Sequence, residues 1–585
     1  MYKKTLNKVA FFILNQIVCI LNFMSNTILD IKNLSLSFKS NQTINQVLFD
    51  VTYQLHKNEI LGVVGESGSG KSVSSLAILG LLPKKNTLFN SGDILFHNES
   101  VLTYSNEDFR KLRGNKIAII FQEPMTSLNP SITCGTQVIE ILQEHLNLSK
   151  EDAKQEVIAL FTKVKLPNPE DIYSKYPHQI SGGQKQRVMI AMAIACKPDV
   201  LIADEPTTAL DVTVQKEIIA LLKSIQKETG MSIIFISHDL ALISEISDRV
   251  VVMYKGKIVE QGNVAEVFHK PQHNYTKALI NSRPSVTERL KILPTISDYL
   301  NNTILTEVVS KEERDINHEQ LYNSEPLLKV VNVEKSYITK GFLSKKDTEF
   351  KAVNNVSFDL YEGETLGLVG ESGCGKSTLG NAILQLDKAT SGQIFYKGKD
   401  IANISKPELR QLRKEIQLIF QDPYSSLNPR IPVGKAIMEP MKVHKLYGND
   451  KDRKEKTLEL LKRVGLEESH FYRYPHEFSG GQRQRIGIAR TIAVNPKLII
   501  CDESVSALDI SVQAQVLNLL NELKENFGFS YIFISHDLAV VKYMSDQLVV
   551  MNQGQIEEIG EADSIYAAPQ KVYTKTLIDA IPKGQ

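Results

Sequence analysis

The chain has 585 residues, of which 68 are basic and 67 acidic, so its formal net charge is +1 at neutral pH. Apolar residues make up 42% and charged residues 23%, which is ordinary for globular protein, and the length is too great for one hydrophobic core. The balanced charge argues against a strongly basic nucleic-acid-binding protein. The five cysteines are scattered and form no Cys-x-x-Cys pair, which argues against a disulfide framework or a zinc or iron–sulfur site and fits a reducing compartment.

The first 25 residues are unlike the rest, because three lysines precede an uncharged apolar run at 9–24. A signal peptide would have this polarity, but no small-residue cleavage site follows. A membrane span would need about 20 residues. The third interpretation is that translation starts at Met24 and that the upstream stretch is not part of the protein. We expect the third, with a peripheral membrane anchor as the alternative, because an alternating strand pattern begins at Ile28.

Residues 65–72 fit the pattern G-x-x-x-x-G-K-[ST] between a predicted strand at 60–64 and a predicted helix at 73–82. Such a loop turns its backbone N–H groups toward phosphate oxygens at the N-terminus of a helix. We expect Lys71 to reach the β/γ-phosphates and Ser72 to hold Mg²⁺. The predicted ATP-binding residues of this loop are Gly65, Glu66, Ser67, Gly68, Ser69, Gly70, Lys71 and Ser72.

The same loop recurs in the second half of the chain. Ser181, Glu205 and His238 also recur, as Ser479, Glu503 and His536 with one common spacing. A repeat at this distance predicts two tandem domains, at 26–283 and 326–585, after an apolar extension at 1–25. The second set of ATP-binding residues is Gly370, Glu371, Ser372, Gly373, Cys374, Gly375, Lys376, Ser377 and Thr378.

A linker at 284–325 separates the two predicted domains. It lacks a clear apolar period and carries the charged run 311–315, so we predict a solvated tether. No uninterrupted apolar run of the length of a membrane span occurs, which predicts that the chain builds no pore of its own.

An apolar strand that ends in two acids occurs in each half, at 200–205 and 498–503. Buried parallel strands have this composition, and their carboxyl ends lie beside the phosphate loop of a doubly wound sheet. Asp204 and Asp502 are predicted to bind Mg²⁺. Glu205 and Glu503, one residue further on, are predicted to orient and deprotonate the attacking water.

Two further polar residues per half also end apolar strands. His238 and His536 are predicted to contact the γ-phosphate and to hold the water and the glutamate in line. Gln122 and Gln421 are predicted to touch Mg²⁺ or its water through the side-chain carbonyl. A neutral amide also releases the metal easily, which suits a sensor.

A second anion-binding pattern opens a predicted helix in each half. It combines a serine hydroxyl, glycine N–H groups and a helix N-terminus, in Ser181, Gly182, Gly183 and Gln184 and in Ser479, Gly480, Gly481 and Gln482. Together with the phosphate loops, these segments resemble the P-loop and the signature motif of ABC-type ATPases. In that family the signature of one domain closes over the nucleotide held by the other.

The resemblance covers nearly all of residues 27–580. It implies an α/β fold with two tandem P-loop ABC-type nucleotide-binding domains, each with a mixed-sheet RecA-like core, an antiparallel β part and a helical signature subdomain. Phe38 and Tyr337 match the family's adenine-stacking position. Ala209–Asp211 and Ala507–Asp509 match the loop that communicates across the dimer.

The subfamily follows from elements around these motifs. Segments 121–130 and 420–430, with 176–181 and 474–479, resemble the ATPases of peptide/nickel importers. Residues 271–276 resemble that group's C-terminal Pro-x-His-Pro-Tyr-Thr, with Asn274 in place of the second proline, and a weaker copy lies at 569–574.

The resemblance implies ATP and Mg²⁺ as cofactors and ATP hydrolysis coupled to import of peptides or peptide-like solutes. The implied partners are two integral-membrane permease subunits and a solute-binding protein, without nucleic acid, at the cytoplasmic face of the bacterial inner membrane. The segments after Gln122 and Gln421, with helical insertions at 130–178 and 429–476, would contact the permeases. Each ATP site would combine the phosphate loop of one half with the signature of the other.

Two alternatives stay open: a tandem ABC ATPase outside transport, such as a ribosome-associated translation factor, and an importer of another solute such as nickel. Solute specificity is expected to reside in the permeases and the binding protein.

Four departures qualify the resemblance. Ser504 follows the second glutamate where the first half has Pro206, and we expect it to tune the loop. Met192 stands where the second half has Arg490. Residues 270–325 lack the cysteines that some importer ATPases carry there, so we predict no iron–sulfur cluster. Cys374 is either a harmless small residue or a thiol whose modification blocks the second site, with ATP protecting it.

Overall fold

The computed structural model describes residues 26–40, 43–122, 127–208, 210–285, 288–339, 348–422, 424, 426–506 and 508–581. The chain divides into two compact units. Unit 1 comprises Met1–Leu210, Val214–Ile280 and Pro582–Gln585, and unit 2 comprises Asp211–Thr213 and Asn281–Ile581. The N-terminal extension with Met24, Ala209, Ala507 and parts of segments 121–130 and 420–430 lie outside the described residues.

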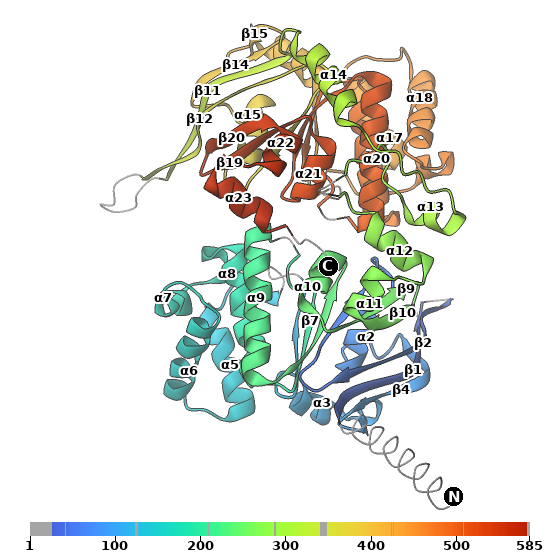
Figure 1. Cartoon of the computed structure of the whole chain (residues 1–585), viewed down its shortest axis with the longest axis vertical. Coiled ribbons are helices and arrows are strands. Elements are labelled where there is room, and N and C mark those ends of the chain that lie inside the picture. Colours follow the sequence, from blue (N-terminus) through green and yellow to red (C-terminus); the bar gives the residue numbers. More distant parts are fainter. Residues whose placement is uncertain are drawn as a thin grey trace, which may run out of the picture. The chain divides into compact units, whose positions relative to one another are not determined.

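The first half of the chain forms two sheets and a group of helices (Figure 1). Its elements in chain order are β1 (Thr27–Lys39), β2 (Ile44–His56), β3 (Ile60–Val64), α2 (Lys71–Ile78), β4 (Thr87–Phe96), β5 (Glu99–Ser100), η1 (Val101–Thr103), α3 (Asn106–Leu112), β6 (Ile117–Ile120), α5 (Cys134–Leu146), α6 (Lys150–Lys163), α7 (Pro169–Ser174), η2 (Pro177–Gln179), α8 (Gly182–Ile194), β7 (Val200–Asp204), α9 (Val212–Thr229), β8 (Ser232–Ser237), α10 (Leu240–Ile246), β9 (Arg249–Tyr254), β10 (Lys257–Asn263), α11 (Val264–His269) and α12 (Asn274–Asn281).

The order of strands in the larger sheet positions the candidate site. The six strands run β10-β9-β3-β8-β7-β6, and only β10 is antiparallel to its neighbour. The carboxyl ends of β6, β7, β8 and β3 therefore meet at one edge, where Gln122, the Asp204–Glu205 pair, His238 and the phosphate loop follow. The smaller sheet, β2-β1-β4-β5, is antiparallel throughout.

The second half repeats this arrangement, with an antiparallel sheet β12-β11-β14-β15 and a mixed sheet β16-β17-β18-β13-β19-β20. Its elements are α13 (Ile296–Asn301), α14 (Lys311–Tyr322), β11 (Leu328–Thr339), β12 (Thr348–Leu360), β13 (Thr365–Val369), α15 (Lys376–Ile383), β14 (Ser391–Tyr396), β15 (Lys399–Asp400), α16 (Lys406–Glu415), β16 (Ile416–Ile419), α17 (Val433–Val443), α18 (Asp450–Arg463), η3 (Glu468–Tyr472), η4 (Pro475–Glu477), α19 (Gly480–Ile492), β17 (Leu498–Asp502), α20 (Ile510–Phe527), β18 (Ser530–Ile534), α21 (Leu538–Met544), β19 (Gln547–Asn552), β20 (Gln555–Glu561), α22 (Ala562–Ala567) and α23 (Val572–Asp579). The predicted α/β fold, with a mixed sheet, an antiparallel sheet and a helical part in each half, is confirmed.

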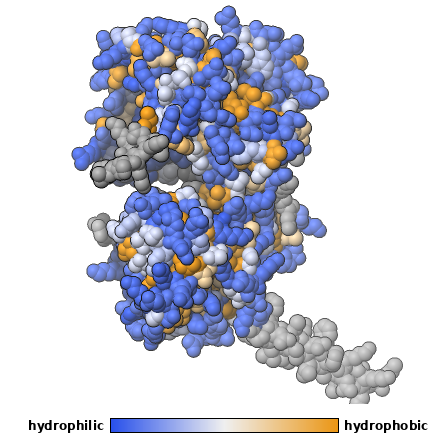
Figure 2. Space-filling model, turned by 90° about the vertical axis from the view of Figure 1, so that its left-hand side faces the viewer, coloured by the Kyte–Doolittle hydropathy of each residue, from blue (hydrophilic) through white to orange (hydrophobic). Residues whose placement is uncertain are grey.

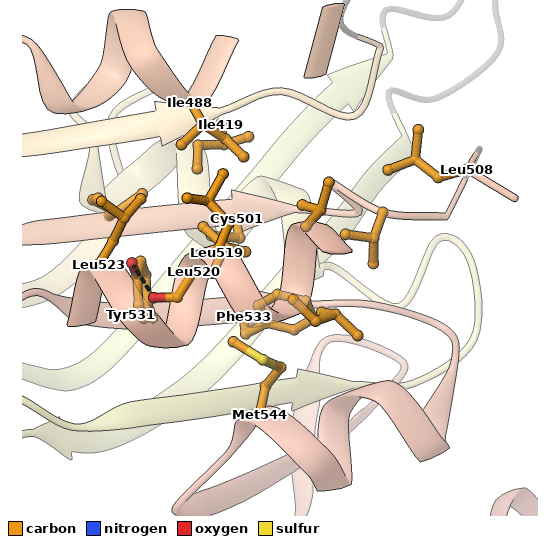
Figure 3. Close-up of a cluster of buried hydrophobic side chains, with 14 of the residues drawn as sticks. Ile419, Ile488, Cys501, Leu508, Leu519, Leu520, Leu523, Tyr531, Phe533 and Met544 are labelled. Carbon is orange, nitrogen blue, oxygen red and sulfur yellow. Dashed lines mark hydrogen bonds between the residues drawn. The ribbon is translucent and has the colours of Figure 1, made fainter. Parts of the chain in front are cut away.

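The strands of each mixed sheet are unbroken apolar runs because both faces of the sheet are covered. All residues of β3, β7 and β8 are buried, as expected for parallel strands with both faces covered. Figure 3 shows the corresponding core in unit 2, where Cys501 of β17 and Phe533 of β18 lie among side chains of the surrounding helices. The Tyr531 hydroxyl donates a hydrogen bond to the Leu520 carbonyl at 3.0 Å, which satisfies the polar group of a fully buried ring.

The linking segment, residues 284–325, corrects one prediction. Its described residues are not a solvated tether, because they pack on the rest of unit 2. Leu293 is 1% exposed, and its backbone exchanges two hydrogen bonds with the Asn518 side chain, at 2.9 and 2.8 Å. Helix α14 begins at the Ser310 cap and contributes Arg314, which is 8% exposed. The apolar contacts are too sparse to give a period, so the sequence pattern concealed this packing.

Charged contacts hold the same segment in place. Arg289 donates to the carbonyls of Tyr543 and Ser545, at 2.9 and 3.0 Å, at the end of helix α21. Arg314 forms ion pairs with Glu561 at 2.6 Å and with Asp563 at 2.9 Å. Each of these contacts joins positions more than 200 residues apart, so local sequence patterns could not reveal them.

The face of the molecule in Figure 2 is mostly hydrophilic, with apolar residues in small scattered groups. Among the described residues, no helix has the length and apolar character that crossing a membrane requires.

Candidate functional site

The first phosphate loop adopts the conformation that its glycines predict. Gly65, Gly68 and Gly70 all have positive φ, at 152°, 79° and 101°. A Cβ atom on Gly65 would lie 2.2 Å from the Met253 carbonyl oxygen, so no other residue fits there. Lys71 Nζ donates to the carbonyls of Gly65 and Glu66, at 2.7 and 3.0 Å, and holds its charge inside the loop.

The second loop has the same geometry. Gly370, Gly373 and Gly375 have positive φ, and Lys376 Nζ donates to the carbonyls of Gly370 and Glu371 at 2.7 and 2.9 Å. Both halves thus present the same loop at the start of helices α2 and α15.

A serine and an aspartate meet beside each loop. Ser72 Oγ donates to Asp204 Oδ1 at 3.2 Å, and Ser377 Oγ donates to Asp502 Oδ1 at 2.9 Å. Burial raises the pKa of both aspartates above the ordinary value. A hydroxyl and a carboxylate side by side are hard oxygen donors, so this pair fits Mg²⁺ and its preference for oxygen ligands.

The first glutamate receives several contacts on one oxygen. Glu205 Oε2 accepts hydrogen bonds from Gln122 Nε2 at 2.8 Å and from Thr208 Oγ1 at 3.1 Å, and lies 3.2 Å from His238 Nδ1. Burial alone would raise the pKa of Glu205, but the hydrogen bond and charge of His238, with Lys71, outweigh it and lower the pKa. The carboxylate is therefore ionised at neutral pH, as a proton acceptor must be.

The second glutamate has a similar but smaller set of contacts. Glu503 Oε2 accepts from Gln421 Nε2 at 2.6 Å and lies 3.5 Å from His536 Nδ1. The hydrogen bond from His536 lowers the pKa of Glu503, and the same contact outweighs burial to raise the pKa of the histidine. The structure thus brings together the strand-end residues that the sequence singled out.

Backbone strain marks both glutamates. Glu205 and Glu503 each have φ of 47°, in the left-handed region that disfavours side chains. Such a conformation costs about 1–3 kcal/mol and clusters at functional sites. Each residue is fixed by a backbone hydrogen bond to the neighbouring strand, from Glu205 N to Ile236 O and from Glu503 N to Ile534 O, both at 2.9 Å.

The predicted signature segments each form a reciprocal cap on a helix of 13 residues. In α8, Gln184 N donates to Ser181 Oγ at 3.3 Å, and Ser181 N donates to the Gln184 side chain at 3.0 Å. Ser479 and Gln482 repeat this cap on α19. The serine and the glutamine therefore have a structural role besides the predicted one.

The two glycines of each signature differ in their surroundings. A Cβ atom on Gly183 would lie 2.8 Å from the Val214 side chain, and one on Gly481 would lie 2.2 Å from Val512, so these glycines allow a neighbouring helix to pack closely. Gly480 has no atom within 4 Å of such a Cβ, so its backbone is open to a ligand. The pairing of each phosphate loop with the signature of the other half stays a prediction.

The two predicted adenine-stacking aromatics differ. Phe38 is partly buried against the core of unit 1. Tyr337 is 43% exposed, and its hydroxyl donates to Asp387 Oδ2 at 2.7 Å. The Thr378 side chain of helix α15 also hydrogen-bonds Tyr337, which places this ring beside the second phosphate loop. Of the two rings, Tyr337 is the more exposed, although Lys335 Nζ lies over it at 5.2 Å from the ring centroid.

Cys374 lies inside the second phosphate loop, where Ser69 stands in the first. It is 5% exposed, and burial raises the pKa of its thiol. A thiol reacts as the thiolate, so the buried position favours the simpler of the two interpretations, a small residue that fills the loop.

Thr208 is the contact residue that the sequence interpretation missed. It is a short polar residue three positions after the glutamate, between the strand and helix α9, and its counterpart Ser506 is also a hydroxyl residue. Its proximity to the glutamate was the available signal, but a hydroxyl in a loop more often caps the backbone.

Comparisons with known proteins agree with this geometry. The family model described as "ABC transporter" matches residues 48–208 and 353–506. A second model, "Oligopeptide/dipeptide transporter, C-terminal region", matches 259–304 and 558–585. The glutathione import ATP-binding proteins GsiA of Escherichia coli (strain K12) and Shigella boydii are each 46% identical over 569 residues, which are 96% of this chain and 90% of the relative.

Among solved structures, the dimeric post-hydrolysis state of an ATP-binding cassette bound to ADP and Pi is 31% identical and covers 40% of this chain and 98% of that chain, with a TM-score of 0.37. The two family matches and the near full-length relatives settle the classification. The chain belongs to the ABC transporter family, as an ATP-binding protein with two ATPase cassettes in tandem.

Proposed function

We propose that this chain is the ATP-hydrolysing subunit that energises a bacterial importer of peptides or peptide-like solutes. The observation that carries the proposal is the repeated set of lysine, serine, aspartate, glutamate, glutamine and histidine at one edge of both mixed sheets. The peptide assignment rests on the oligopeptide/dipeptide transporter matches after each cassette and on relatives named for import of glutathione, a peptide.

The chemistry assigned to each half follows from its contacts. Glu205 and Glu503 take the proton of the attacking water, and His238 and His536 hold the glutamate and the γ-phosphate in line. Both carboxylates are hydrogen-bonded on Oε2, and Oε1 is proposed to accept the proton.

A magnesium ion fits the serine–aspartate pair of each half. The residues that would hold it are Ser72 with Asp204 and Ser377 with Asp502, and the carbonyls of Gln122 and Gln421 would join directly or through water. When bound, Mg²⁺ neutralises charge on the β- and γ-phosphate oxygens of ATP. The lysines of the phosphate loops carry the remaining positive charge toward the same oxygens.

Each ATP is proposed to lie between the phosphate loop of one half and the signature of the other. Site one then combines Lys71 and Glu205 with Ser479–Gln482, and site two combines Lys376 and Glu503 with Ser181–Gln184. Support comes from the open backbone at Gly480 at a helix N-terminus, which suits an anion. ATP binding would close the two halves and hydrolysis would release them.

The proposed partners are two membrane permease subunits and a solute-binding protein, with this chain at the cytoplasmic face of the bacterial inner membrane. The helices α5 to α7 and α17 to α18, within the predicted insertions at 130–178 and 429–476, would contact the permeases. This assignment is supported by the family and by relatives that are named as import ATP-binding proteins.

A reconstituted complex tests the proposal. The full chain is used to capture membrane proteins from its host, and the purified complex is placed in liposomes with its binding protein. We expect ATPase stimulation and uptake with glutathione or a short peptide. If nickel alone stimulates the ATPase, the solute is nickel and not a peptide. If the chain is recovered with ribosomes in place of membrane proteins, the transport function is overturned.

A further inference from the structure

The two catalytic glutamates have unequal neighbours in the turn that follows them. In the first half, Thr208 Oγ1 donates to the Glu205 carboxylate at 3.1 Å. In the second half, Ser506 occupies the same position but its Oγ donates to the backbone carbonyl of Glu503 at 2.8 Å. The turns themselves are alike, because both residues donate a backbone N–H to the glutamate carbonyl at 3.2 Å.

The chemical reason for the difference lies in the side chains. Threonine is β-branched, so its χ1 angle has fewer favourable values than that of serine. The serine hydroxyl is free to turn back to the nearby carbonyl, which is the common behaviour of a short hydroxyl residue. The threonine methyl group needs space of its own, and its hydroxyl points to the carboxylate.

The extra contact has a consequence for the geometry of the base. Glu205 Oε2 is contacted by Gln122, His238 and Thr208, from the ends of two strands and from the following turn. Three contacts from separate directions fix the rotation of a carboxylate more firmly than two. A hydroxyl donor also stabilises the ionised form, and it is one of the causes that lower the pKa of Glu205.

We propose that Thr208 is a positioning residue for Glu205 and that the two ATP sites are therefore not equivalent. Site one holds its base in a fixed orientation through the threonine hydroxyl, while site two, among the described residues, relies on glutamine and histidine. This inference rests on the proposed role of the glutamates as bases. The two sites would then differ in how the catalytic glutamate is held, although their motifs are the same.

The test compares matched variants of the full chain. Thr208→Val keeps the branched shape and removes the hydroxyl, Thr208→Ser keeps a hydroxyl, and Ser506→Ala removes the counterpart. For Thr208→Val we expect kcat to fall by up to about twofold with KM for ATP unchanged, because a transition-state contact is lost at one of two sites.

Ser506→Ala is expected to leave kcat and KM unchanged. Thr208→Ser is expected to lower kcat as Thr208→Val does, since a serine hydroxyl at this position turns back to the glutamate carbonyl. Far-ultraviolet circular dichroism and thermal unfolding verify that each variant folds. An unchanged kcat in Thr208→Val, the same fall of kcat in Ser506→Ala, or a wild-type kcat in Thr208→Ser overturns the inference. Glu205→Gln together with Glu503→Gln separates the two ideas: if that variant still hydrolyses ATP, the base assignment fails instead.

Discussion

The two halves carry the same reactive groups on the same sheet edge, yet they support them differently. At the start of β3, buried Glu59 is paired with Arg249 at 3.0 Å. At the start of β13, the matching Glu364 accepts from the Tyr322 hydroxyl at 3.2 Å, and Gln547 stands where the arginine would be. The linking segment thus supplies to unit 2 a contact that unit 1 supplies from its own sheet.

The helices behind the signatures differ in the same way. Arg490 of α19 donates to the Ser426 carbonyl at 2.5 Å, and so ties this helix to the segment that follows Gln421. Met192 cannot make this contact in the first half. The comparison teaches that the reacting residues are the same in both halves, whereas several residues that support them differ.

The largest expected effect tests the feature that both halves share. Replacing Glu205 and Glu503 together by glutamine removes both proton acceptors but preserves shape and hydrogen bonding. We expect ATP binding to persist and hydrolysis to fall by about 10²–10⁴-fold, the contribution of general base catalysis. Binding is measured by calorimetry and turnover by phosphate release. Substantial remaining turnover would remove the glutamates from the base role.

Replacing the two buried glutamates by glutamine should change stability in opposite directions at pH 8. Burial raises the pKa of Glu364 to about 7 from an ordinary value near 4.5. The folded state therefore binds this proton more tightly than the unfolded state, and the group's contribution to stability declines as pH rises from about 4.5 to 7. Glu364→Gln should remove this decline and stabilise unit 2 by about 3 kcal/mol at pH 8.

Glu59→Gln is the matched variant in unit 1. Because Arg249 would lose its partner, this change should destabilise the protein at pH 8. Urea unfolding of both variants at pH 5 and pH 8 provides the measurement. Equal responses of the two variants would show that the supporting contacts are equivalent after all.

Removing the contact of the linking segment with the rest of unit 2 should have a moderate effect on stability. Arg314→Ala removes two ion pairs of a buried guanidinium, although the side chains of Glu561 and Asp563 are 32% and 39% exposed. We expect a loss of about 2 kcal/mol in the free energy of unfolding of unit 2. Lys291→Ala is the control, since its pairs with Glu307 and Glu313 are solvent-exposed and contribute little to stability. A similar loss in both variants would contradict the difference in burial.

The smallest effect concerns the loop cysteine. Because Cys374 is buried and its thiol pKa is raised, maleimide treatment of the folded chain should leave ATPase activity nearly unchanged. Mass spectrometry reports whether the residue has reacted, and Cys374→Ser is the control for nonspecific loss. Rapid modification with loss of activity that ATP prevents would favour the alternative interpretation.

The sequence predicted the residues whose position follows from a strand end or a glycine loop. Gln122, Glu205 and His238 were found because parallel strands bring their carboxyl ends to one edge, and this rule needs no side-chain detail. Thr208 and Arg314 were missed for a physical reason. Their roles depend on a rotamer or on a partner far along the chain, and neither leaves a periodic signal.

The packing of the linking segment has a consequence for synthesis. Arg289 leaves the ribosome long before its partners Tyr543, Ser545 and Asp563. The first cassette is then complete and can fold as a unit, since domains generally fold as the chain emerges. The arginines of the linking segment can pair only after residues close to the C-terminus have been synthesised. Its docking would therefore be a late step of assembly, and a chain that ends before Glu561 would leave Arg289 without Asp563 and Arg314 without both Glu561 and Asp563.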